Sequence, residues 1–324
     1  MLSTRYFAVI AIGLLMGASL AGAARARIPV IFDTDIGDDI DDTWALALIV
    51  KSPELDLKLV VGDNFKTTYR AKLLAKFLTV AERTDVPVGI GFGSAKDGGG
   101  QSKWVEGYDL KSYAGKVYDD GVQAMIDLIM ASEQPITIIA TGPIQNVAEA
   151  LKRRPEIAKK AKFVGMHGSV RVGYDGNKKP AAEYNVKVDP KACQKAFTAP
   201  WDITITPLDT CGLVRLRGEK YAKVRDSKDP IAAAVIENYR IWSGSNVQQA
   251  KTGSSVLFDT VAVYLTFSNR ELTKMEKLPI HVTDSGMTVI ADGAKVIDVA
   301  AAWKDLGAYE DLLAERLTSP GNGK

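Results

Sequence analysis

The chain has 324 residues, with 41 Lys and Arg against 39 Asp and Glu, 46% hydrophobic residues and two cysteines. This is an ordinary globular composition, and it excludes the disordered and collagen-like classes. A formal net charge of +2 without basic runs provides no electrostatic surface for nucleic acid, so we expect no nucleic-acid partner. With so few cysteines, stability must come from a packed core, and a chain of this length buries roughly three quarters of its unfolded surface.

The first 23 residues predict a secretory signal peptide. Arg5 precedes an apolar run over residues 6–20, and the small residues 21–23 form a cleavage site of the Ala-x-Ala type. A second candidate site lies at residues 24–26, so the position of cleavage is open up to about residue 26. The apolar run is short for the roughly 20 residues of a membrane span. We therefore expect an exported protein, periplasmic or secreted, without membrane contact after cleavage.

Apolar runs rich in Val and Ile alternate with amphipathic stretches along the rest of the chain. The runs predict strands at residues 28–32, 57–61, 87–91, 136–140, 163–166 and 201–207. The stretches between them predict helices at residues 43–51, 68–83, 121–132, 144–152 and 190–198. Residues 215–246 have a helical pattern, residues 277–299 return to short strands, and the Gly-rich segments 91–100 and 173–180 predict loops.

This alternation predicts a single α/β domain over residues 24–324, with a mainly parallel central sheet and helices on both faces. Ligands bind such sheets at the carboxyl ends of the strands. The two Gly-rich loops are therefore expected at the rim of a site. Cys193 and Cys211 could be oxidised in an exported protein or remain buried thiols, and the sequence does not decide between these states.

Six aspartates follow the first predicted strand within ten residues: Asp33, Asp35, Asp38, Asp39, Asp41 and Asp42. Carboxylates so close together must be protonated, point into water or be neutralised by a cation. A solvated acidic loop is one interpretation. Because a buried strand would deliver these carboxylates to the ligand-binding edge of the sheet, a divalent metal site is the better one.

An all-oxygen donor set suits calcium or magnesium. The pattern argues against an EF-hand loop, because Gly37 stands at a ligand position and the twelfth-position glutamate is missing. The chain also has no Gly-x-x-x-x-Gly-Lys phosphate loop, so nothing supports nucleoside triphosphate chemistry.

Residues 33–46 resemble the opening motif of the inosine-uridine-preferring nucleoside hydrolase family, Asp-x-Asp-x-Gly-x-Asp-Asp followed by an Ala-Leu-rich helix, with two additional residues between Gly37 and Asp41. Later segments are similar to further family motifs, at residues 60–64, 138–148, 182–190 and 258–262. The resemblance extends over most of the chain after the leader. It implies the family fold, hydrolysis of ribonucleosides to ribose and free base, a bound Ca²⁺ ion, and a homo-oligomer, either a dimer or a tetramer.

The resemblance also assigns site residues. It implies a metal held by Asp35, Asp42, the Thr141 carbonyl and Asp259, with the additional residues leaving open which of Asp38, Asp39, Asp41 and Asp42 is a ligand. Asp35 would also be the general base that deprotonates water. Ribose contacts would come from Asp41, Asn64, Asn177, Glu183 and Asn185, of which Asn185 also belongs to the catalytic set. Asp63 occupies the usual place of Asn64 and could replace it.

This chain differs from the family pattern at the position of the group that protonates the leaving base. Many members have a histidine immediately before the late aspartate, where this chain has Phe258. Of its two histidines, His167 follows a predicted strand and could face the substrate or be structural. Candidate groups for stacking on the base are Phe258, Tyr239, Trp242, Trp104 and Tyr108, against the alternative that they pack in the core. The sequence does not specify the base.

Three other functions compete with ribonucleoside hydrolysis. The first is hydrolysis of another ribosyl compound. The second is a haloacid-dehalogenase-like phosphatase, because Asp33-Thr34-Asp35 follows a strand, but Gly37 stands where those enzymes have Thr or Val. The third is a non-catalytic periplasmic nucleoside- or ribose-binding protein, which the missing histidine favours and the retained Asp35 opposes. Release of free sugar, release of phosphate or binding without product separates these functions.

Overall fold

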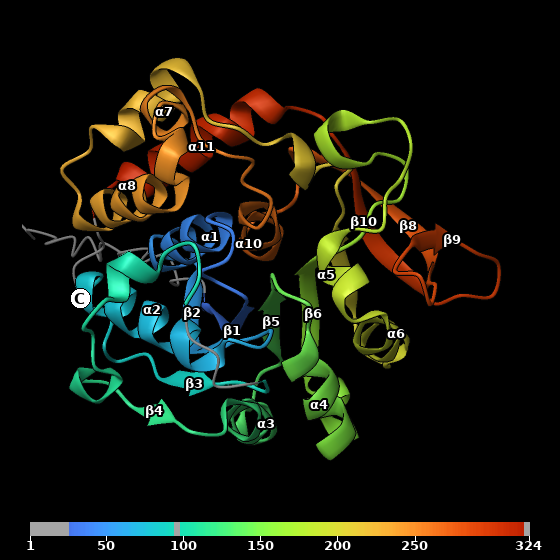
Figure 1. The fold of residues 1–324 in the computed structure, drawn as a ribbon. Helices are drawn as coiled ribbons and strands as arrows, with labels where there is room; N and C mark the ends of the chain where they lie inside the picture. Colours follow the sequence, from blue (N-terminus) through green and yellow to red (C-terminus); the bar gives the residue numbers. More distant parts are fainter. Residues whose placement is uncertain (1–25, 94–97, 321–324) are drawn as a thin grey trace, which may run out of the picture.

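Ten strands form one sheet in the part of the chain that the computed structural model describes, residues 26–93 and 98–320 (Figure 1). The predicted signal peptide lies outside the described residues. The strand order is β4-β3-β2-β1-β5-β6-β7-β10-β8-β9. The strands are β1 (Ile28–Thr34), β2 (Leu55–Gly62), β3 (Val88–Ile90), β4 (Val117–Tyr118), β5 (Ile136–Ala140), β6 (Ala161–Met166), β7 (Ile203–Thr206), β8 (Thr273–Val282), β9 (Thr288–Ile290) and β10 (Val296–Trp303).

The sheet is parallel from β4 through to β10, and β8 then pairs antiparallel with both β10 and β9. In its centre, Phe32 of β1 stands opposite Val60 of β2 and Ile139 of β5. Strands covered on both faces have continuous apolar sequences. For this reason, all six strands predicted between residues 28 and 207 are present in the structure. The predicted mainly parallel α/β fold is confirmed.

Helices cover both faces of the sheet (Figure 1). One hydrophobic core lies under the helices around α1, and the other lies under α3, α4 and α6. The helices are α1 (Asp41–Val50), α2 (Thr67–Val80), α3 (Gly121–Ala131), α4 (Gln145–Arg153), α5 (Tyr184–Val188), α6 (Pro190–Thr198), α7 (Gly218–Arg225), α8 (Pro230–Ser243), α9 (Gln249–Thr252), α10 (Thr260–Phe267) and α11 (Leu306–Thr318).

The described residues settle two further points. Cys193 and Cys211 are free, buried thiols. Within residues 26–93 and 98–320, none of the helices combines the length and the apolar character needed to cross a bilayer.

A buried ion pair joins three helices of the α1 side. The ammonium of Lys51, at the end of α1, contacts the carboxylate of Asp229 and donates a hydrogen bond to the carbonyl of Ser319, 2.7 Å away, just after α11. Asp229 also caps α8 by accepting from the backbone N–H groups of Ile231 and Ala232. The side chain of Lys51 is 2% exposed, so its charge has little access to water.

We predict that Lys51→Met lowers the free energy of unfolding by about 3 kcal/mol, because it leaves a partly buried carboxylate without its cation. Urea unfolding followed by circular dichroism measures the change. Lys58→Met is the matched control, since Lys58 pairs with Asp56 at the surface and its loss should cost less than about 1 kcal/mol. Equal losses in the two variants would contradict the prediction.

Candidate active site

A cavity of about 320 Å³ lies at the carboxyl ends of the central strands. Asp35 follows β1, Thr141 follows β5, and Met166 ends β6, so the sheet brings three distant segments to one edge. The residues that line the cavity are Asp35, Asp38, Asp39, Asp41, Asp42, Thr141, Met166, Tyr174, Glu183, Tyr184, Asn185, Trp242, Phe258 and Asp259.

Three of the lining carboxylates form a cluster able to hold a metal ion. Asp41 and Asp42 lie in the first turn of α1, and Asp259 immediately precedes α10; one oxygen of each lies within 4.8 Å of the others. Both helices direct their N-terminal dipoles at these carboxylates, which favours negative charge there. Thr141 donates its hydroxyl to Asp42 at 2.8 Å. The structure therefore adds Asp41, predicted as a ribose contact, to the candidate metal ligands.

The positions of Asp38 and Asp39 differ from those of the cluster. Asp38 forms ion pairs with Lys66 at 2.8 Å and with Arg70 at 2.9 Å. Asp39 is exposed, and its carboxylate accepts a hydrogen bond from the backbone N–H of Ile40. Of the four aspartates that the additional residues left open, the geometry therefore favours Asp41 and Asp42 as ligands.

The cavity concentrates negative charge in a buried place. Burial, followed by the charges of neighbouring carboxylates, raises the pKa of Asp41, Asp42 and Asp259 well above its usual range. Burial also raises the pKa of Asp35 to about 6, against the opposing effect of Arg70. No basic side chain is among the described residues that line the cavity. This set of oxygen donors, of which only Asp38 forms a described ion pair, fits a divalent cation such as calcium or magnesium.

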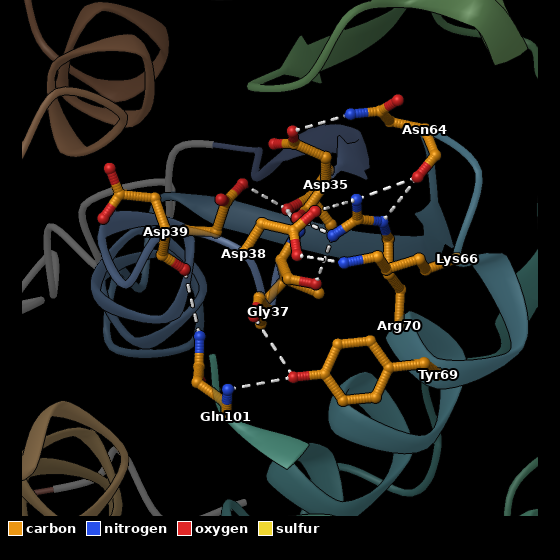
Figure 2. Close-up of polar contacts among 12 residues, drawn as sticks. Asp35, Gly37, Asp38, Asp39, Asn64, Lys66, Tyr69, Arg70 and Gln101 are labelled. Atoms are coloured by element: carbon orange, nitrogen blue, oxygen red, sulfur yellow. Dashed lines mark hydrogen bonds and ion pairs between the residues drawn. The ribbon is translucent and has the colours of Figure 1, made fainter. Parts of the chain in front are cut away.

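Arg70 of α2 fixes the backbone of the Asp-rich loop by hydrogen bonds (Figure 2). Its fully buried guanidinium donates to the carbonyl of Asp35, to the carbonyl of Ile36 at 2.8 Å and to the carbonyl of Asn64 at 2.8 Å, besides its ion pair with Asp38. The sequence analysis missed Arg70. The sequence did contain a sign of its role: an arginine lies in the predicted helix at residues 68–83. A charged side chain that faces the core must find buried acceptors.

Two further side chains of α2 and its neighbouring loop fix the same segment. The hydroxyl of Tyr69 donates to the carbonyl of Gly37 at 3.1 Å and accepts from the backbone N–H of Gln101. The side-chain amide of Gln101 donates to the carbonyl of Asp39 at 3.0 Å (Figure 2). The backbone that carries the aspartates is thus held by neutral hydrogen bonds as well as by Arg70.

The amide and carboxyl groups predicted to bind ribose lie around the carboxylate cluster. Asn64 donates to Asp35 at 3.4 Å (Figure 2), and Asn185 donates to the carbonyls of Thr141 and Met166 at 2.9 and 3.0 Å. Glu183 accepts from the backbone N–H groups of Gly168 and of Asn185, and burial raises its pKa to about 7.

Asp63, the alternative to Asn64, contacts the first turn of α4 in this structure. Its carboxylate accepts from the backbone N–H groups of Gln145 and Asn146 at the start of α4, and it is not among the residues that line the cavity. Burial raises its pKa to about 6.

Four residues predicted to bind substrate are absent from the lining of the cavity: Asn64, which contacts the lining residue Asp35, and Asn177, Tyr239 and His167. Asn177 is exposed and accepts from the backbone N–H of Lys179. Tyr239 is fully buried in the α1-side core, where its hydroxyl donates to the carbonyl of Gly253. His167 packs against Phe163, its Nε2 lies 3.0 Å from the carbonyl of Gly142, and burial lowers its pKa to about 4. In this structure the last three side chains make structural or solvent contacts and form no part of the cavity lining.

Four aromatic residues complete the lining of the cavity. Phe258 and Trp242 lie there as the sequence predicts, together with Tyr174 and Tyr184, which the sequence analysis missed. Trp104 and Tyr108 are not among the lining residues. Tyr174 lies in the Gly-rich loop over residues 173–180. Because that loop was predicted to lie at the rim of a site, its aromatic residue could have been predicted to contact the substrate.

The chain is similar to known nucleoside hydrolases. Residues 30–309 match the family described as inosine-uridine preferring nucleoside hydrolase. The pyrimidine-specific ribonucleoside hydrolase RihA of Citrobacter koseri is 30% identical over 313 residues, which are 90% of this chain and 98% of that protein. RihA of Salmonella newport is 32% identical over 312 residues, with the same shares covered.

Solved structures show the same fold. The plant nucleoside hydrolase PpNRh1 has a TM-score of 0.75 and 23% identity, covering 90% of this chain and 99% of that one. A purine-preferring ribonucleoside hydrolase from Gardnerella vaginalis has a TM-score of 0.72 and 22% identity, over 90% and 98% of the two chains. With its motifs, its fold and its full-length relatives in agreement, the chain belongs to the inosine-uridine preferring nucleoside hydrolase family.

Proposed function

We propose that this protein hydrolyses the N-glycosidic bond of ribonucleosides to ribose and free base, and that it uses a bound calcium ion. One observation carries the proposal: Asp35, Asp41, Asp42 and Asp259 are all buried on one cavity, and none of the described residues that line it is basic. The cavity volume of about 320 Å³ is at the lower end of the size expected for small-molecule sites.

The carboxylates of Asp41, Asp42 and Asp259 would hold the ion, with Asp35 and the Thr141 carbonyl beside them. Calcium accepts six to eight oxygen ligands in flexible geometry, whereas magnesium demands a tight octahedron. A cluster of carboxylates with room for sugar hydroxyls therefore favours calcium. When bound, such an ion makes water more acidic and orients substrate oxygens.

Different residues would then deprotonate water, stabilise the developing charge and bind ribose. Asp35 would take the proton from the attacking water, and its pKa of about 6 lies near the value expected for a general base working at neutral pH. As the bond to the base breaks, positive charge develops on the ribose ring, and the surrounding carboxylates favour that charge. The buried Oδ1 of Asn64 has no hydrogen-bond partner among the described residues, so it can accept from a ribose hydroxyl.

We also propose that the protein is exported and that it forms a homo-oligomer. The cationic start, apolar run and small residues of the leader support export to the periplasm or the medium. N-terminal sequencing of the mature protein would test export, and a start between residues 24 and 27 is expected. The motif resemblance supports a dimer or tetramer, which sedimentation velocity would test.

The first prediction for activity concerns the metal and the base. We expect reducing sugar to form from uridine, cytidine or purine ribonucleosides in calcium, to stop in excess chelator and to resume when calcium is restored. Asp35→Asn should lower kcat by about 10²- to 10⁴-fold, because it removes the group that deprotonates water. Binding of nucleoside without sugar release by the wild-type protein would instead indicate a binding protein.

Asp127→Asn is the matched control for this variant, because Asp127 is a surface residue whose carboxylate contacts only Gln123 among the bonds described. It should leave kcat unchanged. Normal turnover by Asp35→Asn would show that another group takes the proton.

The second prediction links metal binding to pH. The folded-state pKa is raised to about 6 for Asp35 and about 7 for Glu183, against about 4 in the unfolded chain. These groups therefore stabilise the metal-free fold below pH 4, and that contribution is lost as the pH rises towards 7. Calcium needs its carboxylate ligands, Asp35 among them, in the ionised form, so it should raise Tm more at pH 7.5 than at pH 5.

Differential scanning calorimetry with and without calcium measures this difference. At a concentration one hundred times Kd, the ion should add about 2.7 kcal/mol to the free energy of unfolding. Asp259→Asn should reduce the calcium-dependent rise in Tm at pH 7.5. A rise of the same size at both pH values would contradict the proposed set of ionised ligands.

A further inference from the structure

Breaking a glycosidic bond leaves an electron pair on the departing base, so a hydrogen-bond donor facing the base would speed the reaction. Most donors of the cavity are already engaged with the protein. The side-chain amide of Asn185 donates to two carbonyls, those of Thr141 and Met166. The indole N–H of Trp242 donates to the carbonyl of Asp38 at 2.8 Å.

The hydroxyl of Thr141 is engaged as well, since it donates to Asp42. Both oxygens of Glu183 accept backbone N–H groups, from Gly168 and Asn185, so this carboxyl is fixed as the cap of α5. Among the described lining residues, the two phenols of Tyr174 and Tyr184 therefore remain as neutral donors.

The phenol of Tyr174 has a free hydrogen. Its oxygen accepts the backbone N–H of Tyr184 at 2.8 Å, and none of the hydrogen bonds described for this chain uses the hydroxyl as donor. Because an accepted hydrogen bond occupies one lone pair and leaves the O–H available, this hydroxyl can donate to a ligand. The contact also fixes the position of the oxygen.

The ring of Tyr174 lies on the aromatic side of the cavity. It contacts the ring of Phe258 edge-on, with the two centroids 6.3 Å apart and the planes at 80°. A flat heterocyclic base packs well against such rings, whereas the sugar and a cation need the carboxylates of the other side. Tyr174 is therefore the phenol beside which the base would lie.

Tyr184 has a different environment. The residue is 51% exposed, against 39% for Tyr174, and the charges of Asp35 and Asp38 act on its hydroxyl, raising its pKa after the larger effect of burial. Asp35 and Asp38 line the same cavity and can accept the hydrogen of this hydroxyl, so we assign Tyr184 to the sugar side. The two tyrosines thus form a matched pair within one site.

We propose that Tyr174 donates a hydrogen bond to the departing base and so takes the place of a leaving-group acid; this inference rests on the proposed ribonucleoside hydrolysis. The C1′–N bond breaks and its electron pair goes to the base, where the Tyr174 hydroxyl stabilises the developing negative charge. The oxygen of water bonds to C1′, and one proton of that water passes to Asp35 and on to solvent. The base takes up one proton from solvent, so the overall reaction consumes one water.

The surroundings of Tyr174 keep its hydroxyl protonated. Burial, followed by the negative charge of Glu183, raises the pKa of this phenol above its usual range. The group is therefore a neutral donor at neutral pH, and it acts by hydrogen bonding and not by releasing its own proton.

The test is Tyr174→Phe, which keeps the ring against Phe258 and removes the hydroxyl. We expect kcat for the ribonucleosides that the wild-type protein cleaves to fall by about 10²-fold, the scale of one lost donor in a transition state. With p-nitrophenyl β-D-ribofuranoside, whose nitrophenolate leaves without help, kcat should fall by less than about threefold. The ratio of the two losses is the readout, because a general structural defect would lower both rates together.

Tyr184→Phe is the matched control, and it should show no such selective loss. Equal losses on both substrates, no loss on either substrate, or a selective loss in Tyr184→Phe instead would each overturn the role of Tyr174. A wild-type protein that cleaves neither the ribonucleosides nor the nitrophenyl riboside would overturn the proposed hydrolysis itself, and this inference with it. An active wild-type protein with an unselective variant overturns the inference alone.

Discussion

Repulsion among the buried carboxylates is the constraint that the rest of this structure has to satisfy. Asp35, Asp41, Asp42 and Asp259 share one cavity, and burial raises the pKa of each. The fold offsets part of the cost through Arg70, two helix N-termini and hydroxyl donors. What remains is an oxygen-lined cavity with excess negative charge, which is the form a divalent cation requires.

The position of these carboxylates follows from the sheet. Asp35 belongs to the first strand–helix connection, whereas Asp259 comes from a segment more than 200 residues later in the sequence, at the start of α10. Helix α10 packs beside α1 and over β5 and β6 (Figure 1), so two helix N-termini meet above the same strand ends. The parallel topology, and not local sequence, therefore joins the two halves of the cluster.

The sequence predicts the fold and the carboxylates well because both depend on patterns along the chain: apolar runs, and acidic residues directly after a strand. It predicts side-chain direction poorly. Met166 lines the cavity, so His167, the next residue along the chain, points the other way, as successive residues of an extended segment do. Likewise Trp242 reaches the cavity while Tyr239, on the same helix α8, packs into the core. Arg70 was missed because its acceptors are backbone carbonyls, which no sequence pattern displays.

The two walls of the cavity also determine which kind of group can assist the departing base. The carboxylates would favour a histidine that becomes positively charged. However, His167 is buried outside the cavity lining and has a lowered pKa. Phe258, at the usual place of the histidine, lines the cavity. On this aromatic side, the environment disfavours any group that must carry charge. A neutral phenol held by one backbone hydrogen bond, as Tyr174 is, can stabilise charge on the base without becoming charged itself. The anionic wall can then interact with the sugar and the cation while the aromatic wall interacts with the base.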